Sequence, residues 1–443
     1  MTNQFLDAVD YANSMLLLLK NQLVYGRLVD GQYKDQVTDE NGLSVNVKRP
    51  PRFVATSGAT LQAQDLVVGT APVSVDQYKN VHISVGDLEY VQHYNALMQN
   101  ETMKSAASTL AHDVDKFLAG QTIKFNSWVA GGQPGVGSTN ASDPTKNIAT
   151  PSQAMGAHTR LMANGVPNSD LSGVVSFNDG EQIRGTLSSQ FIQDVNATAL
   201  EKVRIPIISE IDWYATQQTP SFTTGTRVQG DGSTTGAQID GGAQNVNYRA
   251  VKGSAGTIGM RQNLLLKGAG NALTFAAGDV FTIQNVYAWD WRNQVATENL
   301  QQFTVVNAVT SSSGGAVTLV ISPAIIVQGT NDGTNTYANT AFATVNSIPA
   351  DSAYVKFVGA ASTVVRVKSA FHKRAISLVS ARLQMPFTGV ASFATDPDTG
   401  ISIRYWRGSD ISTGAHVHRW DMIYGAEVLD PFLGTRICGT ALS

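Results

Sequence analysis

Apolar side chains recur at near-helical spacing at the start of the chain. The apolar positions within residues 3–24 are Phe5, Leu6, Val9, Leu16 and Leu19. This spacing predicts a short amphipathic helix that ends before Gly26. Two interpretations stay open: the helix docks on its own chain, or it reaches as an arm to a neighbouring molecule.

The clearest helical pattern lies in residues 87–119. Its apolar positions, mostly at steps of three and four, are Leu88, Val91, Tyr94, Leu97, Met98, Ala107, Leu110, Val114, Phe117 and Leu118. Asp87 stands at the expected N-cap and Gly120 at the expected stop. At ~1.5 Å per residue the helix would be about 50 Å long, which suits a spine.

A long two-stranded excursion is predicted between these helices, over residues 43–85. Residues 44–50 (SVNVKRP) and 75–85 (VDQYKNVHISV) alternate as strands, and a small, polar segment separates them. A long hairpin with a weak core needs a surface outside itself to pack on.

The predicted secondary-structure pattern changes twice in the rest of the chain. Residues 121–150 are rich in Gly, Ser, Asn and Pro and predict a loop, whereas residues 151–221 alternate short helices and strands. The segments expected there are helices at 151–165 and 178–187 and strands at 173–177 and 203–215.

From about Phe222 to Val345 helical periodicity disappears, which predicts an all-β module. Its β runs lie at 250–260, 279–289, 301–309 and 316–327. The mixed pattern then resumes, with strand candidates at 400–406 and 415–432. The module therefore interrupts one α+β domain, and its length favours folding on its own.

Composition narrows the class of protein. The formal net charge is −3 with no basic block, so nothing favours tight nucleic-acid binding. The single cysteine, Cys438, excludes an internal disulfide framework and suits a reducing cytosol. The apolar N-terminal stretch is too short to span a bilayer and lacks a signal-peptide pattern, so no membrane association is expected.

The C-terminal stretch holds the candidate chemistry. Asp398-Thr399-Gly400 matches the aspartic-protease triplet, but that reaction needs two such carboxylates and no second D-T-G exists. Because the triplet follows Asp396-Pro397 between two β runs, a turn is the favoured interpretation. Asp396 and Asp398 could also be considered as a paired general acid and base, but this interpretation is weak for the same reason: both residues belong to the expected turn.

His416 and His418 would share one face of a strand, as metal ligands can, with Asp421 or His372 as a third ligand. Neighbouring Val417 and Trp420 favour a packed strand instead. Cys438 has no base placed near it by sequence, which favours an inert thiol. No catalytic, cofactor-binding or metal site is therefore predicted, and the protein is not expected to be an enzyme.

Five stretches carry a resemblance to a known family. They are GDVFTI (278–283), LQQFTV (300–305), AFHKRAISLVSARLQMP (370–386), DPDTGISIR (396–404) and RWDMIYGAEVLDPFLGTRI (419–437). They resemble the coat proteins of tailed phages of the P22 type. The resemblance covers nearly the whole chain and is strongest from 276 to 437.

The resemblance implies an α+β fold of the HK97 type with an inserted β-barrel. The implied domains are an N-terminal arm (1–42), an extended hairpin loop (43–86), a peripheral domain with the spine helix (87–150), a first axial segment (151–221), the inserted barrel (222–345) and a second axial segment with returning strands (346–443). In this interpretation D-P-D-T-G is a hairpin turn of the axial sheet.

The implied function is a major capsid protein that self-assembles, through hexamers and pentamers, into an icosahedral head enclosing double-stranded DNA without sequence-specific binding. The expected partners are a scaffolding protein, a portal protein at one vertex and, optionally, a decoration protein. Assembly is expected in the host cytoplasm, and the final location is the virion. A β-rich surface binding protein and an aspartic-type hydrolase remain as alternatives.

Two further expectations follow from comparison with other capsids of this fold. Some have a helical segment of about a hundred residues before the arm, which is later removed; here the arm helix begins within the first residues, so a separate scaffolding protein is expected. Some cross-link through a lysine on the extended loop. No lysine lies between Lys48 and Lys79, so no covalent mesh is expected.

Overall fold

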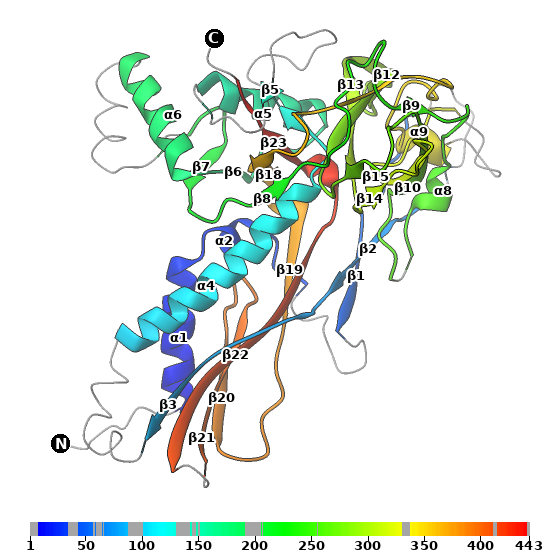
Figure 1. The fold of residues 1–443 in the computed structure, drawn as a ribbon. Coiled ribbons are helices and arrows are strands. Elements are labelled where there is room, and N and C mark those ends of the chain that lie inside the picture. Colours follow the sequence, from blue (N-terminus) through cyan, green and yellow to red (C-terminus); the bar gives the residue numbers. More distant parts are fainter. Residues whose placement is uncertain are drawn as a thin grey trace. The chain divides into compact units, whose positions relative to one another are not determined.

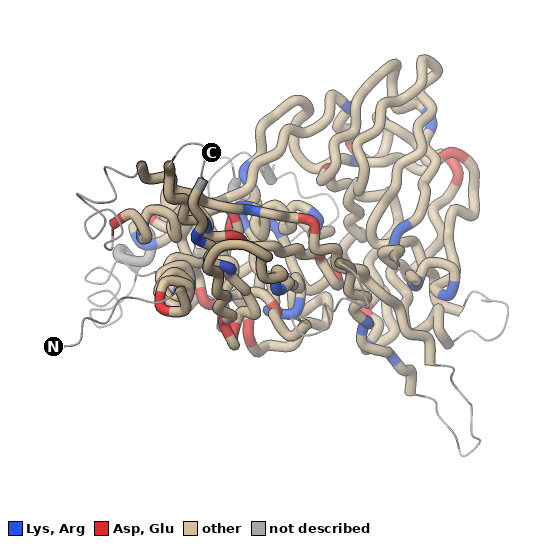
Figure 2. The backbone as a smooth tube through the Cα atoms, turned by 90° about the horizontal axis from the view of Figure 1, so that it is seen from below, with Lys and Arg blue, Asp and Glu red and all other residues tan. Residues whose placement is uncertain are grey.

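The computed structural model describes residues 8–33, 43–55, 58, 64, 66–86, 101–129, 142–143, 148, 151–190, 205, 207–254, 256–329, 337–410 and 414–440. Helices and strands are mixed along the chain, so the predicted α+β class is confirmed (Figure 1). Basic and acidic residues are both scattered over the described backbone (Figure 2).

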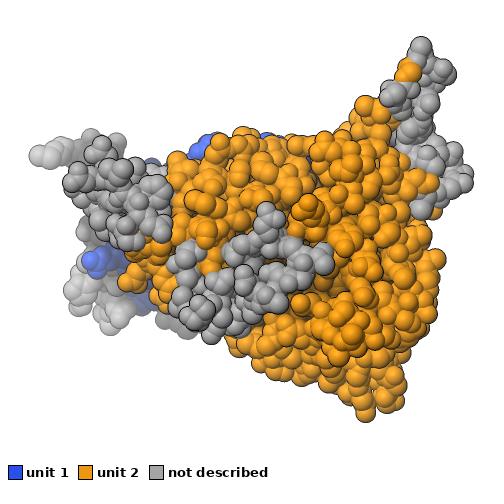
Figure 3. All heavy atoms as spheres, turned by 90° about the horizontal axis from the view of Figure 1, so that it is seen from above, with its two compact units in different colours: residues 1–47, 72–119, 376–427 blue, residues 48–71, 120–375, 428–443 orange. Residues whose placement is uncertain are grey.

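The chain divides into two compact units (Figure 3). Unit 1 comprises residues 1–47, 72–119 and 376–427, and unit 2 comprises residues 48–71, 120–375 and 428–443. None of the helices that the structure describes is both long enough and apolar enough to cross a membrane.

Unit 1 is built on a five-stranded sheet whose central strand is β22 (Ala415–Val428). Its other strands are β3 (Gln77–Gly86), β19 (Ile376–Ala381), β20 (Val390–Thr395) and β21 (Ser402–Asp410). β21 and β3 both pair antiparallel with β22, and Trp420 is opposite Tyr405 on one side and Val81 on the other (Figure 1). Trp420, Tyr405 and Tyr424 are buried and form part of its core.

The N-terminal helix α1 (Ala8–Gln22) packs on β20 and β21 of unit 1. Its buried face consists of Ala8, Tyr11, Ala12, Met15 and Leu19. The ring of Tyr11 lies 5.3 Å from that of Tyr405. A short helix α2 (Tyr25–Leu28) follows, and Asp30 then bridges Ser377 beside β19. Of the two open interpretations, the described part of this helix adopts the one docked on its own chain.

The spine helix α4 is described from Glu101 to Gln121. Residues 87–100, including the expected N-cap Asp87, lie outside the described residues. The expected stop at Gly120 is wrong, because the helix continues through it to Gln121 and passes into the turn η2 (Thr122–Lys124). Gly120 has no positive φ, so it does not act as a left-handed cap.

The pairing expected for the hairpin is also wrong. β1 (Ser44–Lys48) pairs with β2 (Thr70–Ser74), while β3 joins the sheet of unit 1. The physical reason is length: β3 matches β22 over ten consecutive positions, whereas β1 offers only five residues. The longer ladder satisfies more backbone groups of β3.

Unit 2 contains a six-stranded antiparallel sheet of order β16-β12-β13-β15-β10-β9. These strands are β9 (Gln238–Ile239), β10 (Gln262–Lys267), β12 (Val280–Asp290), β13 (Val295–Val305), β15 (Val317–Ser322) and β16 (Val355–Phe357). Its edges meet, because the Ile239 N–H donates to the carbonyl of Ala353 at 2.9 Å and Val355 to that of Ala237 at 2.8 Å. The expected β-barrel is therefore present.

The core of this barrel is aromatic and aliphatic. Phe281, Phe303 and Phe357 are fully buried, and the Phe281 ring lies 5.7 Å from that of Phe303 and 5.3 Å from that of Phe357. The sheet continues beyond Val345, because Phe281 and Phe357 stand opposite each other in the β12–β16 pair. Strands predicted at 279–289, 301–309 and 316–327 are confirmed with shifted ends.

The strand expected at 250–260 is wrong. The chain there forms the short helix α8 (Tyr248–Val251) and then a turn, within which Ser254 bridges Thr257. Gly253 and Gly256 have φ values of +87° and +79°, which L-residues in a strand do not adopt.

A second sheet of unit 2 has the order β4-β23-β18-β6-β7. Its strands are β4 (Trp128–Val129), β6 (Leu171–Val175), β7 (Asp212–Ala215), β18 (Lys368–His372) and β23 (Gly434–Ile437). The helices expected at 151–165 and 178–187 are present as α5 (Pro151–Ala163) and α6 (Phe177–Gln190). Of the strand expected at 203–215, the described residues form β7 (Asp212–Ala215) at its end, and residues 203, 204 and 206 lie outside the described residues.

The barrel joins this second sheet through two adjacent segments. β8 (Ser221–Thr223) pairs with β17 (Val364–Arg366), and the Val367 N–H donates to the Pro220 carbonyl at 2.8 Å. The chain therefore leaves and returns side by side. The remaining described elements are β5 (Ser142–Asp143), β11 (Thr274–Phe275), β14 (Val309–Thr310), α9 (Tyr337–Ala341), η3 (Lys373–Ala375), η4 (Pro431–Leu433) and β24 (Gly439–Thr440).

Candidate functional site

The D-P-D-T-G segment is the hairpin turn between β20 and β21, as predicted, and lies in unit 1. The buried Asp396 carboxylate accepts hydrogen bonds from Thr399 N–H at 3.0 Å and Thr399 Oγ1 at 2.7 Å. Gly400 takes a φ of +75° and its N–H donates to the Asp396 carbonyl at 3.0 Å. These contacts are those of an aspartate-closed turn.

Lys20 of α1 binds both aspartates of this turn. Its Nζ lies 2.9 Å from Asp396 Oδ1 and 2.5 Å from Asp398 Oδ2. Burial raises the pKa of Asp396, but hydrogen bonds from Thr399 and Lys20 outweigh burial and the net pKa is lowered. Asp396 is therefore ionised at neutral pH and engaged in structural contacts, which does not suit a general acid.

The two histidines of β22 share a face and contact hydroxyl groups. His418 is fully buried with its Nδ1 2.6 Å from Tyr405 Oη, and His416 Nδ1 lies 2.9 Å from Ser409 Oγ. Burial, with smaller contributions from Arg407 and His416, lowers the pKa of His418 to about 4, so His418 is neutral at neutral pH.

The third ligands considered for these histidines lie elsewhere. Asp421, three residues beyond His418, belongs to the opposite face of the strand, and His372 belongs to unit 2. Over the described ranges, no three His, Cys, Asp or Glu side chains come together as a metal-binding group.

Asp421 is the centre of a charge cluster that locks β3, β21 and β22 together. Its carboxylate is buried and lies 2.6 Å from Arg404 Nη2 and 2.5 Å from Arg419 Nε. Tyr78 of β3 donates to it at 3.0 Å and accepts from Arg419 at 2.7 Å. Burial and the hydrogen bond to Asp421 raise the pKa of Tyr78. The cluster fixes strand register and offers no free base.

Cys438 is buried in unit 2 next to Trp128, Val280 and Val365. Its N–H donates to the Val129 carbonyl at 2.8 Å, so its backbone belongs to the sheet. The buried cations Lys368 and Arg436 also interact electrostatically with Cys438, so its setting is closed to solvent but not purely apolar.

The comparison with protein families decides whether this chain is a structural shell protein or an enzyme. A family model described as "P22 coat protein - gene protein 5" matches residues 9–439. This chain belongs to the P22 coat protein family.

Solved structures show more distant similarity. The chain of Mycobacterium phage Che8 is 12% identical, with 94% of this chain and 90% of that chain covered and a TM-score of 0.44. The capsid of cyanophage P-SCSP1u is 10% identical, with 95% and 89% covered and a TM-score of 0.45. The CUS-3 coat protein I-domain is 23% identical, covers 29% of this chain and 100% of its own, and has a TM-score of 0.21. No curated protein matches the sequence.

The coat protein is therefore a structural major capsid protein and not an enzyme. It has the HK97-like capsid fold with an inserted barrel, and it assembles with copies of itself into the phage head shell. The D-P-D-T-G segment, which matches the aspartic-protease triplet, forms a hairpin turn in this shell protein.

The coat protein holds its inserted barrel to the second sheet of unit 2 through buried polar contacts that sequence reasoning missed. Arg436 of β23 donates through Nη1 to the Gly278 carbonyl at 2.8 Å and through Nη2 and Nε to that of Phe125 at 2.6 and 3.0 Å. Gln302 of β13 accepts from Trp128 N–H at 2.6 Å and donates to its carbonyl at 3.0 Å.

A buried ion pair stands at the base of the same barrel. Arg227 Nε lies 3.2 Å from Asp279 Oδ2, and both side chains have no exposed surface. Burial lowers the pKa of Arg227, and Asp279 partly offsets that. Arginine is mostly an exposed residue, so no sequence pattern indicated that Arg227 and Arg436 are interior residues.

Proposed function

We propose that subunits of this coat protein join through a projecting apolar loop of unit 1, residues 382–389, which binds a second copy of the chain. The observation that carries this proposal is Phe387, whose side chain is fully exposed at 108% of its reference area. Met385 in the same loop and Val390 directly after it are also exposed, at 47% and 46%. A self-assembling protein supplies a partner that can cover them.

The expected strength of this contact suits assembly. Burying one phenylalanine side chain contributes roughly 1.5–3 kcal/mol. Such a contact is weak for one pair of subunits, but a closed shell repeats it in every copy. Weak repeated contacts allow misplaced subunits to leave before the shell closes.

The test is a pair of matched substitutions in the loop, Phe387→Ala and Thr388→Ala. Both subunits should have the urea midpoint of the wild type, because neither side chain is buried. Only Phe387→Ala should reduce the yield of shells seen by sedimentation and negative-stain microscopy. If Phe387→Ala gives the same shell yield as the wild type, the loop is not part of the interface between subunits.

The proposal extends to the partners and the site of assembly. A separate scaffolding protein directs assembly in the host cytoplasm, a portal protein occupies one vertex, and a decoration protein is an optional later partner. The near-neutral net charge of −3 supports a wall that encloses DNA without binding it tightly. Coexpression with the neighbouring phage genes, one omitted at a time, identifies the scaffolding protein by the loss of hollow shells.

The domain roles form the last part of the proposal. Residues 1–42 act as the arm, 43–86 as the extended loop and 87–150 as the peripheral domain. The inserted domain begins at 222 and runs past the sequence-based end at 345 to include β16 (Val355–Phe357), and the axial domain is formed by 151–221 and the chain that follows the barrel up to 443. The exposed side chains of Phe53 and Leu66 support an extended loop that packs on a neighbour. Deletion of 53–66 should leave the subunit folded and stop shell formation.

A further inference from the structure

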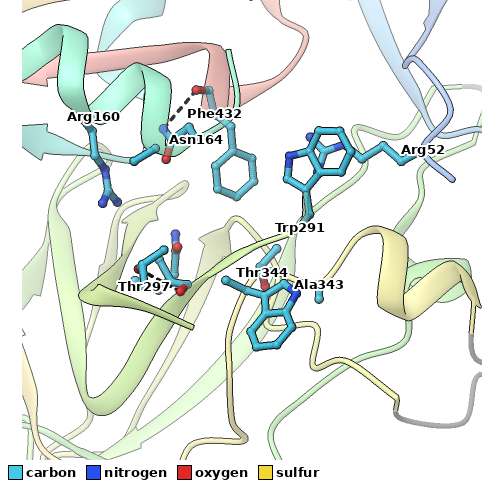
Figure 4. Close-up of a pocket in the computed structure, with 12 residues that line it drawn as sticks. Arg52, Arg160, Asn164, Trp291, Thr297, Ala343, Thr344 and Phe432 are labelled. Atoms are coloured by element: carbon cyan, nitrogen blue, oxygen red, sulfur yellow. Dashed lines mark hydrogen bonds between the residues drawn. The ribbon is translucent and has the colours of Figure 1, made fainter. Parts of the chain in front are cut away.

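A small cavity in unit 2 is lined by an arginine that has no counterion among the residues described by the structure. Arg160 extends from α5 toward the strand that carries Thr297, and only 4% of its surface is exposed (Figure 4). Asn164, Trp291, Arg52 and Phe432 also line the cavity. All of these residues belong to unit 2.

Arg160 has no carboxylate within ion-pair distance among the residues that the structure describes, and its Nε has no hydrogen-bond partner there. The other arginine of the cavity, Arg52, is already engaged. Its Nη2 lies 3.6 Å from Asp430, and its guanidinium stacks 4.8 Å from the Trp291 ring. The cavity therefore has more positive than negative charge.

The unsatisfied polar atoms around the cavity are all donors. Besides Arg160 Nε they are the indole nitrogens of Trp289 and Trp291, which are buried and have no acceptor among the described residues. Asn164 Nδ2 is satisfied, because it donates to the Phe432 carbonyl at 3.2 Å (Figure 4). A surplus of donors favours an acceptor, and a negative one above all.

Energetics point the same way. Burial lowers the pKa of Arg160 to about 10, so the side chain is still a cation at neutral pH. An unpaired buried charge is costly, and an anion close to it removes much of that cost. The space open to the centre of a water molecule is about 20 Å³, more than the roughly 10–15 Å³ that a single water needs, so the cavity has room for a small group of a few atoms.

We propose that this cavity binds one small monovalent anion of the carboxylate class, held by the Arg160 guanidinium. The anion is either free in solution, such as formate, or the carboxylate of an aspartate or glutamate from a second copy in the shell. Both sources present the same chemistry to Arg160. The inference does not depend on the loop interface proposed above.

The experiment compares the unfolding of unassembled subunits in formate with unfolding in a bulky sulfonate at equal ionic strength. At a formate concentration ten times its Kd, the ratio of folded to unfolded wild type should rise about tenfold. Arg160→Met, which keeps the volume, should lose this response. Arg374→Met, at an exposed position, should keep it.

Two results overturn the proposal. One is a wild type that unfolds equally in formate and sulfonate, and the other is an Arg160→Met variant with the wild-type response. If Arg160→Met fails to fold, line broadening of ¹³C-formate by wild type replaces it. Broadening that chloride relieves supports the site, and its absence overturns the site.

A second arm separates the two sources of the anion. The formate response is measured again with assembled shells. A response that persists in shells assigns the site to a free anion, whereas a response confined to free subunits assigns it to a carboxylate of the neighbouring copy.

Discussion

Arg436 provides the sharpest test of how the barrel is attached. The perturbation is Arg436→Met, which keeps most of the side-chain volume and removes all the donors. Arg436 has no exposed surface, so no water replaces these donors. Its guanidinium also lies 4.7 Å from the ring of Trp128, and that contact is lost as well.

The magnitude follows from the acceptors that remain. Gly278 O loses the Arg436 donor, and a buried carbonyl without a partner costs about 1–3 kcal/mol. Phe125 O keeps the Thr304 hydroxyl at 3.1 Å, so its loss is smaller, at about 1 kcal/mol. A desolvated cation–π contact adds roughly 1–2 kcal/mol.

One effect opposes these losses. Burial lowers the pKa of Arg436 to about 9, so the cation is costly to hold in the interior, and methionine removes that cost. This gain offsets the loss of the hydrogen bonds and of the ring contact only in part. We expect a net loss of about 2–3 kcal/mol in the free energy of unfolding.

The assay is urea denaturation of unassembled subunits, with hydrogen exchange read at the amides of β13 and β23. Exposed Arg374→Met is the control and should change stability by less than about 0.5 kcal/mol. Protection should fall on both strands in Arg436→Met, because they meet at this residue. A variant as stable as the control would show that apolar packing alone attaches the barrel.

Three further predictions concern pH, the insertion and the shell. Burial raises the pKa of Asp115 to about 6. The contribution of protonated Asp115 to stability is therefore complete below about pH 4 and is lost as the pH rises through 6. The urea midpoint of the wild type should fall over this range when measured between pH 4 and 8, and Asp115→Asn should remove this fall. A fragment of residues 220–367 should give a dispersed amide NMR spectrum, whereas a fragment of residues 222–345, which lacks β16, should give a collapsed one. Phe281→Ala should lower the free energy of unfolding of the longer fragment by about 3–5 kcal/mol. Boiled virions should run as monomers on a denaturing gel, because 54–77 has no lysine, and a ladder of multimers would contradict this.

Local patterns predicted the local elements. Helical spacing located α5, and alternation located β12 and β15, which bury mainly one face; β13 was located as a β run, and its last five residues are all buried. The turn at Asp396 was readable because aspartate, threonine and glycine close it through their own side chains and backbone. Such features depend on residues a few positions apart.

Features that join distant segments were not predictable in this way. β1 and β22 both alternate enough to pair with β3, and only the length of the assembled ladder decides for β22. Arg436 meets carbonyls more than 150 residues away, and nothing in its neighbours indicates them. The burial of Arg160 could not be predicted from the sequence either, because an arginine on a helix is normally expected to be exposed.

The buried polar contacts of unit 2 make physical sense in a shell of identical copies. Apolar packing is not directional, so a barrel held only by apolar contacts could shift against the second sheet at little cost. Gln302, paired with both backbone groups of Trp128, and Arg436, bound to carbonyls on two segments, each tolerate one arrangement. Replacing one such group by an apolar side chain leaves its backbone partners buried without a hydrogen bond, which lowers stability and loosens orientation together. We therefore expect substitutions here that preserve folding still to broaden the distribution of shell sizes, because an error in barrel placement recurs at every subunit.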